Sequence, residues 1–180
     1  LDTMIEVIAE YIFAKKEIDE RFLKAVFEGI VAYQALEGLY FSAGFVYFHS
    51  LARDDKMLES NSLINMIRTD ENQHSEIFGL LIQVMMAEFP SLNTKTNMDY
   101  AVNFFKECVQ AEKEWSEWLF EDIDTLSIKE YHNYVEYLAN LLCRNAGMIE
   151  AYPENKELKS RWIATYGSKK RDSKDSSQIV

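Results

Sequence analysis

The residues of this sequence best suited to bind a metal ion are two acids and a histidine. Glu71 and His74 form a Glu-x-x-His pair, and side chains three positions apart on a helix lie one turn apart, so both can reach one ion. Glu37 lies one predicted helix earlier, among aromatic and aliphatic residues. Carboxylate oxygens with an imidazole nitrogen suit iron or manganese better than structural zinc, which favours thiolates. We therefore predict that Glu37, Glu71 and His74 are metal ligands.

Helical spacing also predicts that these three side chains point into the protein core. Apolar residues recur at steps of three and four on either side of them: Ile64, Ile67, Phe78, Leu81 and Met85 around the pair, and Ile30, Tyr33, Phe41, Phe45 and Phe48 around Glu37. Buried charges left uncompensated cost several kcal/mol each, and a cation removes that cost. A Glu-x-x-His pair alone is more often a solvated surface pair than a metal site, so the prediction depends on this apolar placement.

The remaining histidines and the cysteines have ordinary interpretations. His49 and His132 have no Glu three residues before them, so we interpret them as ordinary helix or surface residues. Cys108 and Cys143 form no zinc pattern and are predicted to be buried free thiols, as in a reducing cytoplasm. The aromatic run near Glu37 is interpreted as core packing: Tyr40, Phe41, Phe45, Tyr47 and Phe48.

The elements that must position these residues are all predicted to be helices. Six glycines and two prolines in 180 residues are too few for a turn-rich β fold. Apolar periodicity predicts helices over about 3–15, 17–52, 58–89, 97–122, 127–151 and 156–166. We expect an all-α fold in which residues 1–167 form a helical bundle and residues 168–180 form a flexible polar tail.

Local residues predict where several of these helices begin and end. Asn97 is the expected N-cap of the fourth helix. Ser127 and Glu130 fit a capping box at the start of the fifth, and Pro153 is expected to follow its end.

Charge and the N-terminal residues narrow the class of protein. A formal net charge of −11 argues against a nucleic-acid groove or an anionic membrane surface as partner. Apolar stretches are too short for a membrane span, and the acids Asp2, Glu6 and Glu10 argue against a signal peptide. The sequence starts with Leu1, as if inside a helix, so we expect a fragment, a processed product or one piece of a split protein in the cytoplasm.

Several stretches together match one known family. A-L-E-G-L-Y-F-S-A-G-F at 35–45 and I-R-T-D-E-N-Q-H-S at 67–75 resemble the second pair of metal-ligand helices in class I ribonucleotide reductase small subunits. Residues 109–120, 134–140 and 155–163 resemble downstream segments of that family. The resemblance covers about residues 20–166 and implies a ferritin-like helical bundle, of which this chain is the C-terminal half.

The resemblance implies a role for each matching residue. Glu37, Glu71 and His74 correspond to ligands of a dinuclear metal centre of iron or, as the alternative, manganese. Asp70 matches an acid that hydrogen-bonds a ligand histidine and helps to conduct an electron and a proton toward the partner subunit. An apolar wall that shields the oxidised cofactor from water is matched by Phe41, Phe45 and Ile67.

This sequence holds only part of such a site. Bundles of this kind use a Glu from each of two helices and a Glu-x-x-His from each of two others, whereas one of each is present here. We therefore expect a second polypeptide with the N-terminal half, a dimer of the completed small subunit, and the large subunit as partner. The implied function is to store an oxidising equivalent that the large subunit uses to reduce ribonucleotides to deoxyribonucleotides.

Two other functions remain open at this point. The same bundle occurs in other di-iron oxidases and in ferritin-like storage proteins. A half-subunit that only stabilises or regulates an intact one would need no metal.

Overall fold

Every regular element in the described part of the chain, residues 2–121 and 125–168 of the computed structural model, is helical. The elements are α1 (Asp2–Ala14), α2 (Glu20–Ala35), the π-helix η1 (Leu36–Phe41), α3 (Ser42–Arg53), α4 (Leu58–Glu88), α5 (Lys95–Leu119), α6 (Ile128–Asn145) and α7 (Arg161–Ser168). The all-α prediction is confirmed. None of these helices is long and apolar enough to cross a bilayer. The predicted tail overlaps α7 at Ser168 and otherwise lies outside the described residues.

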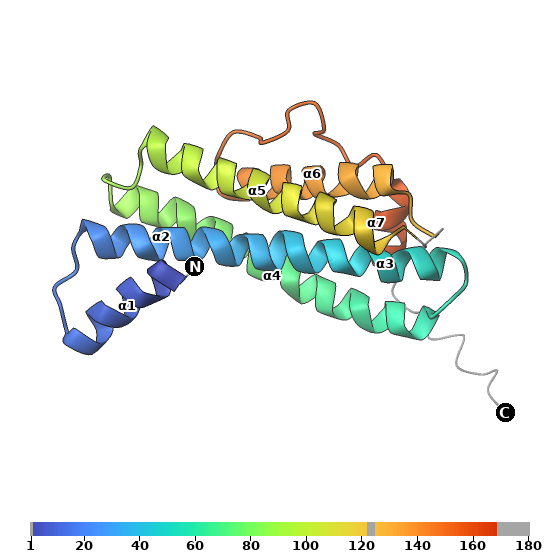
Figure 1. Cartoon of the computed structure of the whole chain (residues 1–180), viewed down its shortest axis with the longest axis horizontal. Coiled ribbons are helices and arrows are strands. Elements are labelled where there is room, and N and C mark those ends of the chain that lie inside the picture. Colours follow the sequence, from blue (N-terminus) through green and yellow to red (C-terminus); the bar gives the residue numbers. More distant parts are fainter. Residues whose placement is uncertain (1, 122–124, 169–180) are drawn as a thin grey trace.

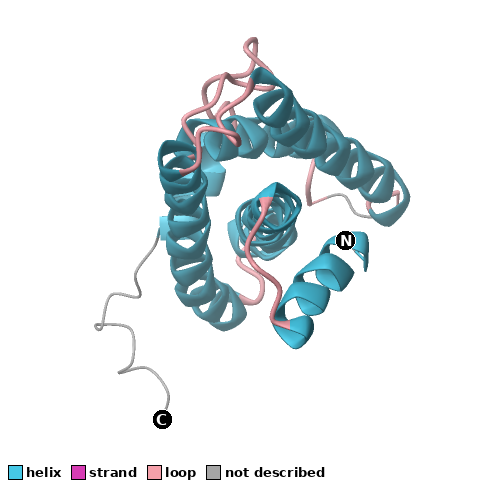
Figure 2. Cartoon of the chain, turned by 90° about the vertical axis from the view of Figure 1, so that its left-hand side faces the viewer, coloured by secondary structure: helices cyan, strands magenta, loops and turns pink. Residues whose placement is uncertain are grey.

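A nearly continuous rod formed by α2, η1 and α3 runs through the centre of the molecule (Figure 1). The view in Figure 2 shows this rod ringed by other helices, and the rod contacts α1, α4, α5, α6 and α7. Its fully buried side chains, Phe27, Val31, Leu39 and Val46, belong to the main hydrophobic core. Burial of such side chains contributes roughly 1.5–3 kcal/mol each to the stability of the fold.

The predicted helix over 17–52 differs from the structure at its start and in its middle. It begins at Glu20, because the Asp19 carboxylate accepts a hydrogen bond of 3.0 Å from the backbone N–H of Phe22 and caps the helix there. In the middle, Leu36–Phe41 adopt π-helical geometry. Isolated π turns inside α-helices are rare and often coincide with functional sites. Glu37 lies in this turn.

Two of the predicted helix caps are wrong. Thr94, not Asn97, caps α5, since its hydroxyl accepts a hydrogen bond of 3.2 Å from the Asn97 backbone N–H. Ser127 does occupy the N-cap position of α6, but its side chain makes no capping hydrogen bond. Glu130, the expected partner in the capping box, accepts a hydrogen bond of 3.1 Å from Trp162 Nε1 instead. A tertiary partner has therefore replaced the local one.

The chain leaves α6 at Asn145, well before the predicted end at Ala151. Gly147 adopts a left-handed φ of +69°, and its N–H donates to the carbonyl of Arg144 at 3.0 Å. A left-handed glycine just past a helix satisfies the last carbonyls and ends the helix. The last helix correspondingly starts at Arg161 rather than Lys156.

Several large apolar side chains of α4 are left uncovered by this chain. They are 41–68% exposed and form two groups on one face of the helix, separated by the exposed Asp70 and Gln73: Leu63 and Met66, then Ile77, Leu80 and Val84. Soluble monomers rarely expose large apolar patches, so each of these two groups has the composition of an interface. Both cysteines are buried free thiols, as predicted.

Candidate metal centre

The three predicted ligands converge in space. Glu37 comes from η1, and Glu71 and His74 come from α4, which packs against η1. One potential ligand atom from each residue lies within 4.8 Å of the other two. His74 Nδ1 lies 2.7 Å from Glu71 Oε2 and 3.6 Å from Glu37 Oε2. Within the described residues this is the only such group of metal-binding side chains.

A glycine beside Glu37 allows η1 to approach its neighbours closely. A Cβ atom on Gly38 would collide with the Ser75 hydroxyl and with a methyl group of Leu142 on α6. Ser75 follows His74 directly in the chain, so this close contact lies beside the candidate ligands. One turn earlier, Gln34 Nε2 donates a hydrogen bond of 3.1 Å to the Leu142 carbonyl. Packing against α4 and α6 therefore fixes where Glu37 lies.

The three side chains shift one another's pKa values. Partial desolvation, followed by the neighbouring Glu71, raises the pKa of Glu37. The pKa of Glu71 is lowered, first by its hydrogen-bonding interaction with Glu37 and then by His74. The hydrogen bond to Glu71 raises the pKa of His74. A proton is thus held within the cluster, at the place where a metal cation would replace it.

The prediction that these side chains point into the core of the chain is wrong for His74, while Glu37 and Glu71 are largely but not fully buried. The His74 side chain is 51% exposed, while those of Glu37 and Glu71 are 16% and 15% exposed. The buried residues of α4 lie on a different face: Asn61, Asn65, Ser75, Gly79, Ile82 and Met86. Apolar residues occupy more than one face of α4, and periodicity does not say which of them this chain buries itself.

The residues of the predicted apolar wall are themselves partly exposed, and their shielding role stays a prediction. Phe41 is 39% exposed and Ile67 is 45% exposed, and the Phe41 ring stacks on the half-buried Phe45 at 6.4 Å between centroids. Tyr33 is 51% exposed and stacks on Phe78 of α4 at 5.8 Å. We call the exposed surface formed by Tyr33, Phe41, Ile67, Leu81 and the three candidate ligands the ligand face.

The aromatic run near Glu37 is core only in part. Phe41 belongs to the ligand face, whereas Tyr40, Phe45, Tyr47 and Phe48 are half-buried.

The proposed relay residue Asp70 directly precedes the candidate ligand Glu71 in the chain. Asp70 is exposed on α4, and no hydrogen bond joins its carboxylate to another residue in the described ranges 2–121 and 125–168. Its role stays a prediction. His49 is not a surface residue but is fully buried, with Nδ1 2.6 Å from Asn61 Oδ1 and Nε2 3.3 Å from Arg68 Nη1. His132 is partly buried beside Ser116.

Sequence reasoning missed the residues that support the ligands. Gly38 and Ser75 each follow a ligand directly, and their small size was the only available signal. Gln34 of α2 is fully buried and bonds to α6, and nothing in its sequence context distinguishes it from a surface glutamine.

The chain matches a known family over most of its length. A family model described as the small chain of ribonucleotide reductase matches residues 2–159. The beta subunit of ribonucleoside-diphosphate reductase from Halalkalibacterium halodurans is 32% identical over 153 residues, covering 84% of this chain and 44% of the relative. The beta subunit from Treponema pallidum is 31% identical over 153 residues, covering 83% of this chain and 44% of the relative. The chain thus spans less than half the length of these relatives.

Solved structures of similar fold extend the same comparison. A putative class I ribonucleotide reductase from Bacillus halodurans superposes with a TM-score of 0.79 at 28% identity, covering 92% of this chain and 57% of that one. The ribonucleotide reductase R2 subunit from Clostridium botulinum gives a TM-score of 0.76 at 26% identity, covering 92% of this chain and 50% of that one. The predicted ferritin-like helical fold is confirmed.

Proposed function

The chain belongs to the ribonucleotide reductase small-chain family, and on that premise we propose that it forms part of a ribonucleoside-diphosphate reductase small subunit. The observation that carries this proposal is the convergence of Glu37, Glu71 and His74 within 4.8 Å. Two carboxylates and an imidazole are a donor set that suits iron or manganese. The three residues would hold their share of a dinuclear centre, which when bound supplies an oxidising equivalent.

The neighbouring residues have distinct tasks in this proposal. Phe41, Phe45 and Ile67 would exclude water from the oxidised centre once their exposed surfaces are covered, since a dry apolar shell controls solvent access to a metal. The Asp70 carboxylate would accept and release a proton as an electron moves toward the large subunit, where ribonucleotides are reduced.

We propose that a second polypeptide completes the site. The chain supplies one Glu and one Glu-x-x-His, which is half of the ligand set used by bundles of this kind. The exposed apolar side chains of the ligand face and of α4 support such a partner, because they are the kind of surface that a packed helix covers. We propose that this partner carries the N-terminal half, and that the completed subunit dimerises and binds the large subunit.

Metal content of the assembled complex tests the proposal. The complex would be purified through a tag on this chain, and iron and manganese would be measured per complex for the wild type, Glu71→Ala and His132→Ala. We expect stoichiometric metal in the wild type and in the His132 control, since His132 lies beside Ser116 and away from the cluster. Glu71→Ala should lose most of the metal.

Reductase activity of the same variants separates this function from a scaffolding role. With large subunit and ribonucleotide added, Glu71→Ala should lose activity in parallel with its metal. A metal-free complex with full activity would refute the proposed role of the cluster. Full activity of Glu71→Ala would show that this half only stabilises an intact subunit.

A further inference from the structure

A buried tyrosine and a buried carboxylate form a pair between α5 and α6, on other elements than the candidate metal ligands. The Tyr131 hydroxyl on α6 donates a hydrogen bond of 2.5 Å to Glu112 Oε2 on α5. Tyr131 is fully buried and Glu112 is only 8% exposed. Burial raises the pKa of Glu112, the bond from Tyr131 opposes this shift, and no cation of the described residues pairs with the carboxylate. The proposed function gives this pair no task.

Two other tyrosines show what distinguishes this pair. Tyr11 also donates a hydrogen bond of 2.5 Å to a carboxylate, but its acceptor Asp19 is exposed and caps α2. Tyr134 lies one turn after Tyr131 on α6 and is only 2% exposed, and no carboxylate of the described ranges accepts from its hydroxyl. Among the described tyrosines that donate to a carboxylate, Tyr131 is therefore the one whose acceptor is buried.

The pair has the groups that a proton-coupled oxidation needs. Removing an electron from a buried phenol that keeps its proton would create a cation in an apolar interior, which is costly. If the proton moves along the hydrogen bond to the carboxylate, the products are a neutral phenoxyl radical and a neutral carboxylic acid. The buried negative charge of Glu112 disappears in the same step, so burial of this carboxylate favours the oxidised products.

Aromatic rings connect Tyr131 to the protein surface. The Phe120 ring meets Tyr131 edge-on at 5.1 Å between centroids and meets Trp115 at 6.4 Å. These separations are those of packed aromatic pairs. Phe120 is only 4% exposed, whereas Trp115 is 45% exposed. An electron therefore has a short and closely packed route between the surface and Tyr131.

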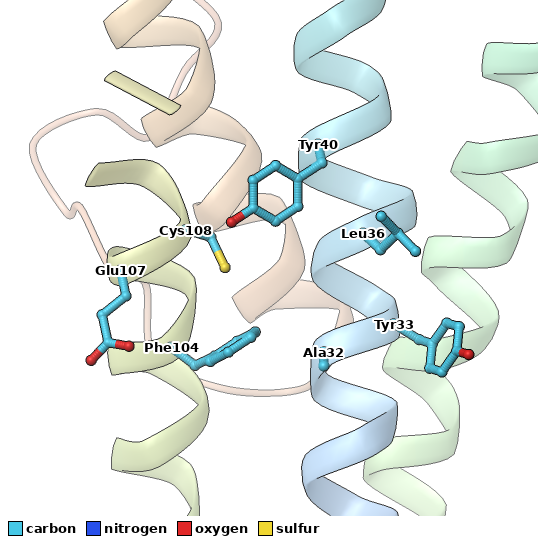
Figure 3. A pocket seen from close by; sticks show the side chains of 7 residues that line it. All are labelled: Ala32, Tyr33, Leu36, Tyr40, Phe104, Glu107 and Cys108. Atoms are coloured by element: carbon cyan, nitrogen blue, oxygen red, sulfur yellow. The ribbon is translucent and has the colours of Figure 1, made fainter. Parts of the chain in front are cut away.

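A hollow of about 310 Å³ between the central rod and α5 gives the Glu112 carboxylate an outlet for a proton. Its lining residues are Tyr40, Gly44, Ala111, Glu112 and Trp115. It reaches the surface at the exposed Trp115. At its other end Tyr40 comes from the π-helix that carries Glu37, and Figure 3 shows the Tyr40 ring directed toward Cys108, one turn before Glu112 on α5. The hollow thus extends from the segment of a candidate metal ligand to Glu112.

We propose that Tyr131 is a second oxidation site of this protein, which gives up one electron to a one-electron oxidant while its phenolic proton passes to Glu112. The O–H bond of Tyr131 breaks, an O–H bond forms on Glu112, and the oxidant is reduced by one electron. The oxidised metal centre of the proposed function is an oxidant of this class, and in this respect the inference rests on that function. Return of one electron and of the proton restores the pair.

Photochemical oxidation of the metal-free full chain tests this inference without the metal centre. Trp118→Cys places a thiol on α5, one turn after Trp115, where the native side chain is 72% exposed. A ruthenium polypyridyl photo-oxidant would be attached there, since both native cysteines are buried. A flash in the presence of a cobalt(III) acceptor generates ruthenium(III), and electron paramagnetic resonance of samples frozen after the flash detects tyrosyl radicals.

Three variants in this background separate a redox role from a structural one. Tyr131→Phe should remove the tyrosyl signal. Glu112→Gln keeps a hydrogen-bond acceptor for Tyr131 but not the base, and it should lose most of the signal because a positioned base speeds proton transfer by roughly a hundredfold or more. Tyr134→Phe is the matched control and should keep the signal. Circular dichroism checks that each variant stays helical.

Each outcome has a defined meaning. Absence of a tyrosyl signal from the parent chain, or a signal that survives Tyr131→Phe, would overturn the inference. An equal signal in Glu112→Gln and the parent would also overturn it, and this comparison decides the matter if Tyr131→Phe does not fold. None of these results bears on the metal centre, because no metal is present. Conversely, an assembled complex without metal would refute the proposed function and leave the photochemical result standing.

Discussion

Replacing Gly38 by alanine tests the packing that positions Glu37. The added methyl group would collide with the Ser75 hydroxyl and with a methyl group of Leu142, and these residues are only 4% and 1% exposed. Because both neighbours are buried, the segment η1 has to move away from α4 and α6, and Glu37 moves with it. Gly44 provides a matched control, since a Cβ atom there would meet nothing within 4 Å.

The expected magnitude follows from two opposing effects. Overpacking a well-packed core costs typically about 1–3 kcal/mol. Replacing glycine by alanine inside a helix contributes roughly 1 kcal/mol of stability through helix propensity. Gly44→Ala should gain only the second effect, whereas Gly38→Ala should show both. The difference in unfolding free energy between the two variants therefore isolates the collision, and we expect it to be about 1–3 kcal/mol.

Urea unfolding followed by circular dichroism measures this difference on the two purified variants in the same assembly. The midpoint should fall for Gly38→Ala and rise for Gly44→Ala, with the same slope for both. Metal content gives a second readout, because a displaced Glu37 should weaken metal binding in the complex. If Gly38→Ala proved as stable as Gly44→Ala, the close packing of η1 against Ser75 and Leu142 would be refuted.

Three further predictions concern buried polar groups. Burial lowers the pKa of His49 from 6.5 to about 4. The folded protein therefore holds His49 neutral, and the free energy of unfolding keeps its full value above pH 6.5, where the unfolded chain is neutral at this residue too. About 3 kcal/mol of that stability should be lost as the pH falls to 4, and His49→Gln should flatten this part of the curve of unfolding free energy against pH. Tyr131→Phe removes a hydrogen bond of 2.5 Å to the buried Glu112 and should lower the free energy of unfolding in urea by roughly 1.5–3 kcal/mol. An unchanged unfolding midpoint would count against this hydrogen bond. Asn140 exchanges hydrogen bonds of 2.8 Å with the backbone of Tyr152, so Asn140→Ala should make the 147–160 loop more susceptible to limited proteolysis than in the wild type.

The type and order of the elements followed from local sequence. Long periodic apolar runs with few glycines predict helices, and α1, α4 and α5 occur within a few residues of their predicted places. The absence of the predicted capping box at Ser127 could not be foreseen, because the Glu130 side chain bonds to Trp162 from a distant part of the chain. Similarly, the π turn at Leu36–Phe41 reflects packing against α4 and α6, which no local pattern describes.

The predicted burial of His74 and of the apolar residues near the ligands was the main error of sequence reasoning. A helix that is apolar on several faces has more apolar surface than the other helices of one chain can bury. Hydrophobic periodicity looks the same for a face buried within the chain and for a face buried against a partner. Ile67 and Phe41 follow the spacing of core residues, yet both are substantially exposed here.

The sequence by itself determined which side chains can bind a metal, because residue type and the three-residue spacing of Glu71 and His74 depend only on the helix that carries them. It also determined that the fold is helical. Only the tertiary structure decided that Glu37 reaches the same point, since that depends on Gly38 allowing two distant segments to pack closely. The tertiary structure likewise decided which apolar faces stay open, because that depends on how the helices of this chain cover one another.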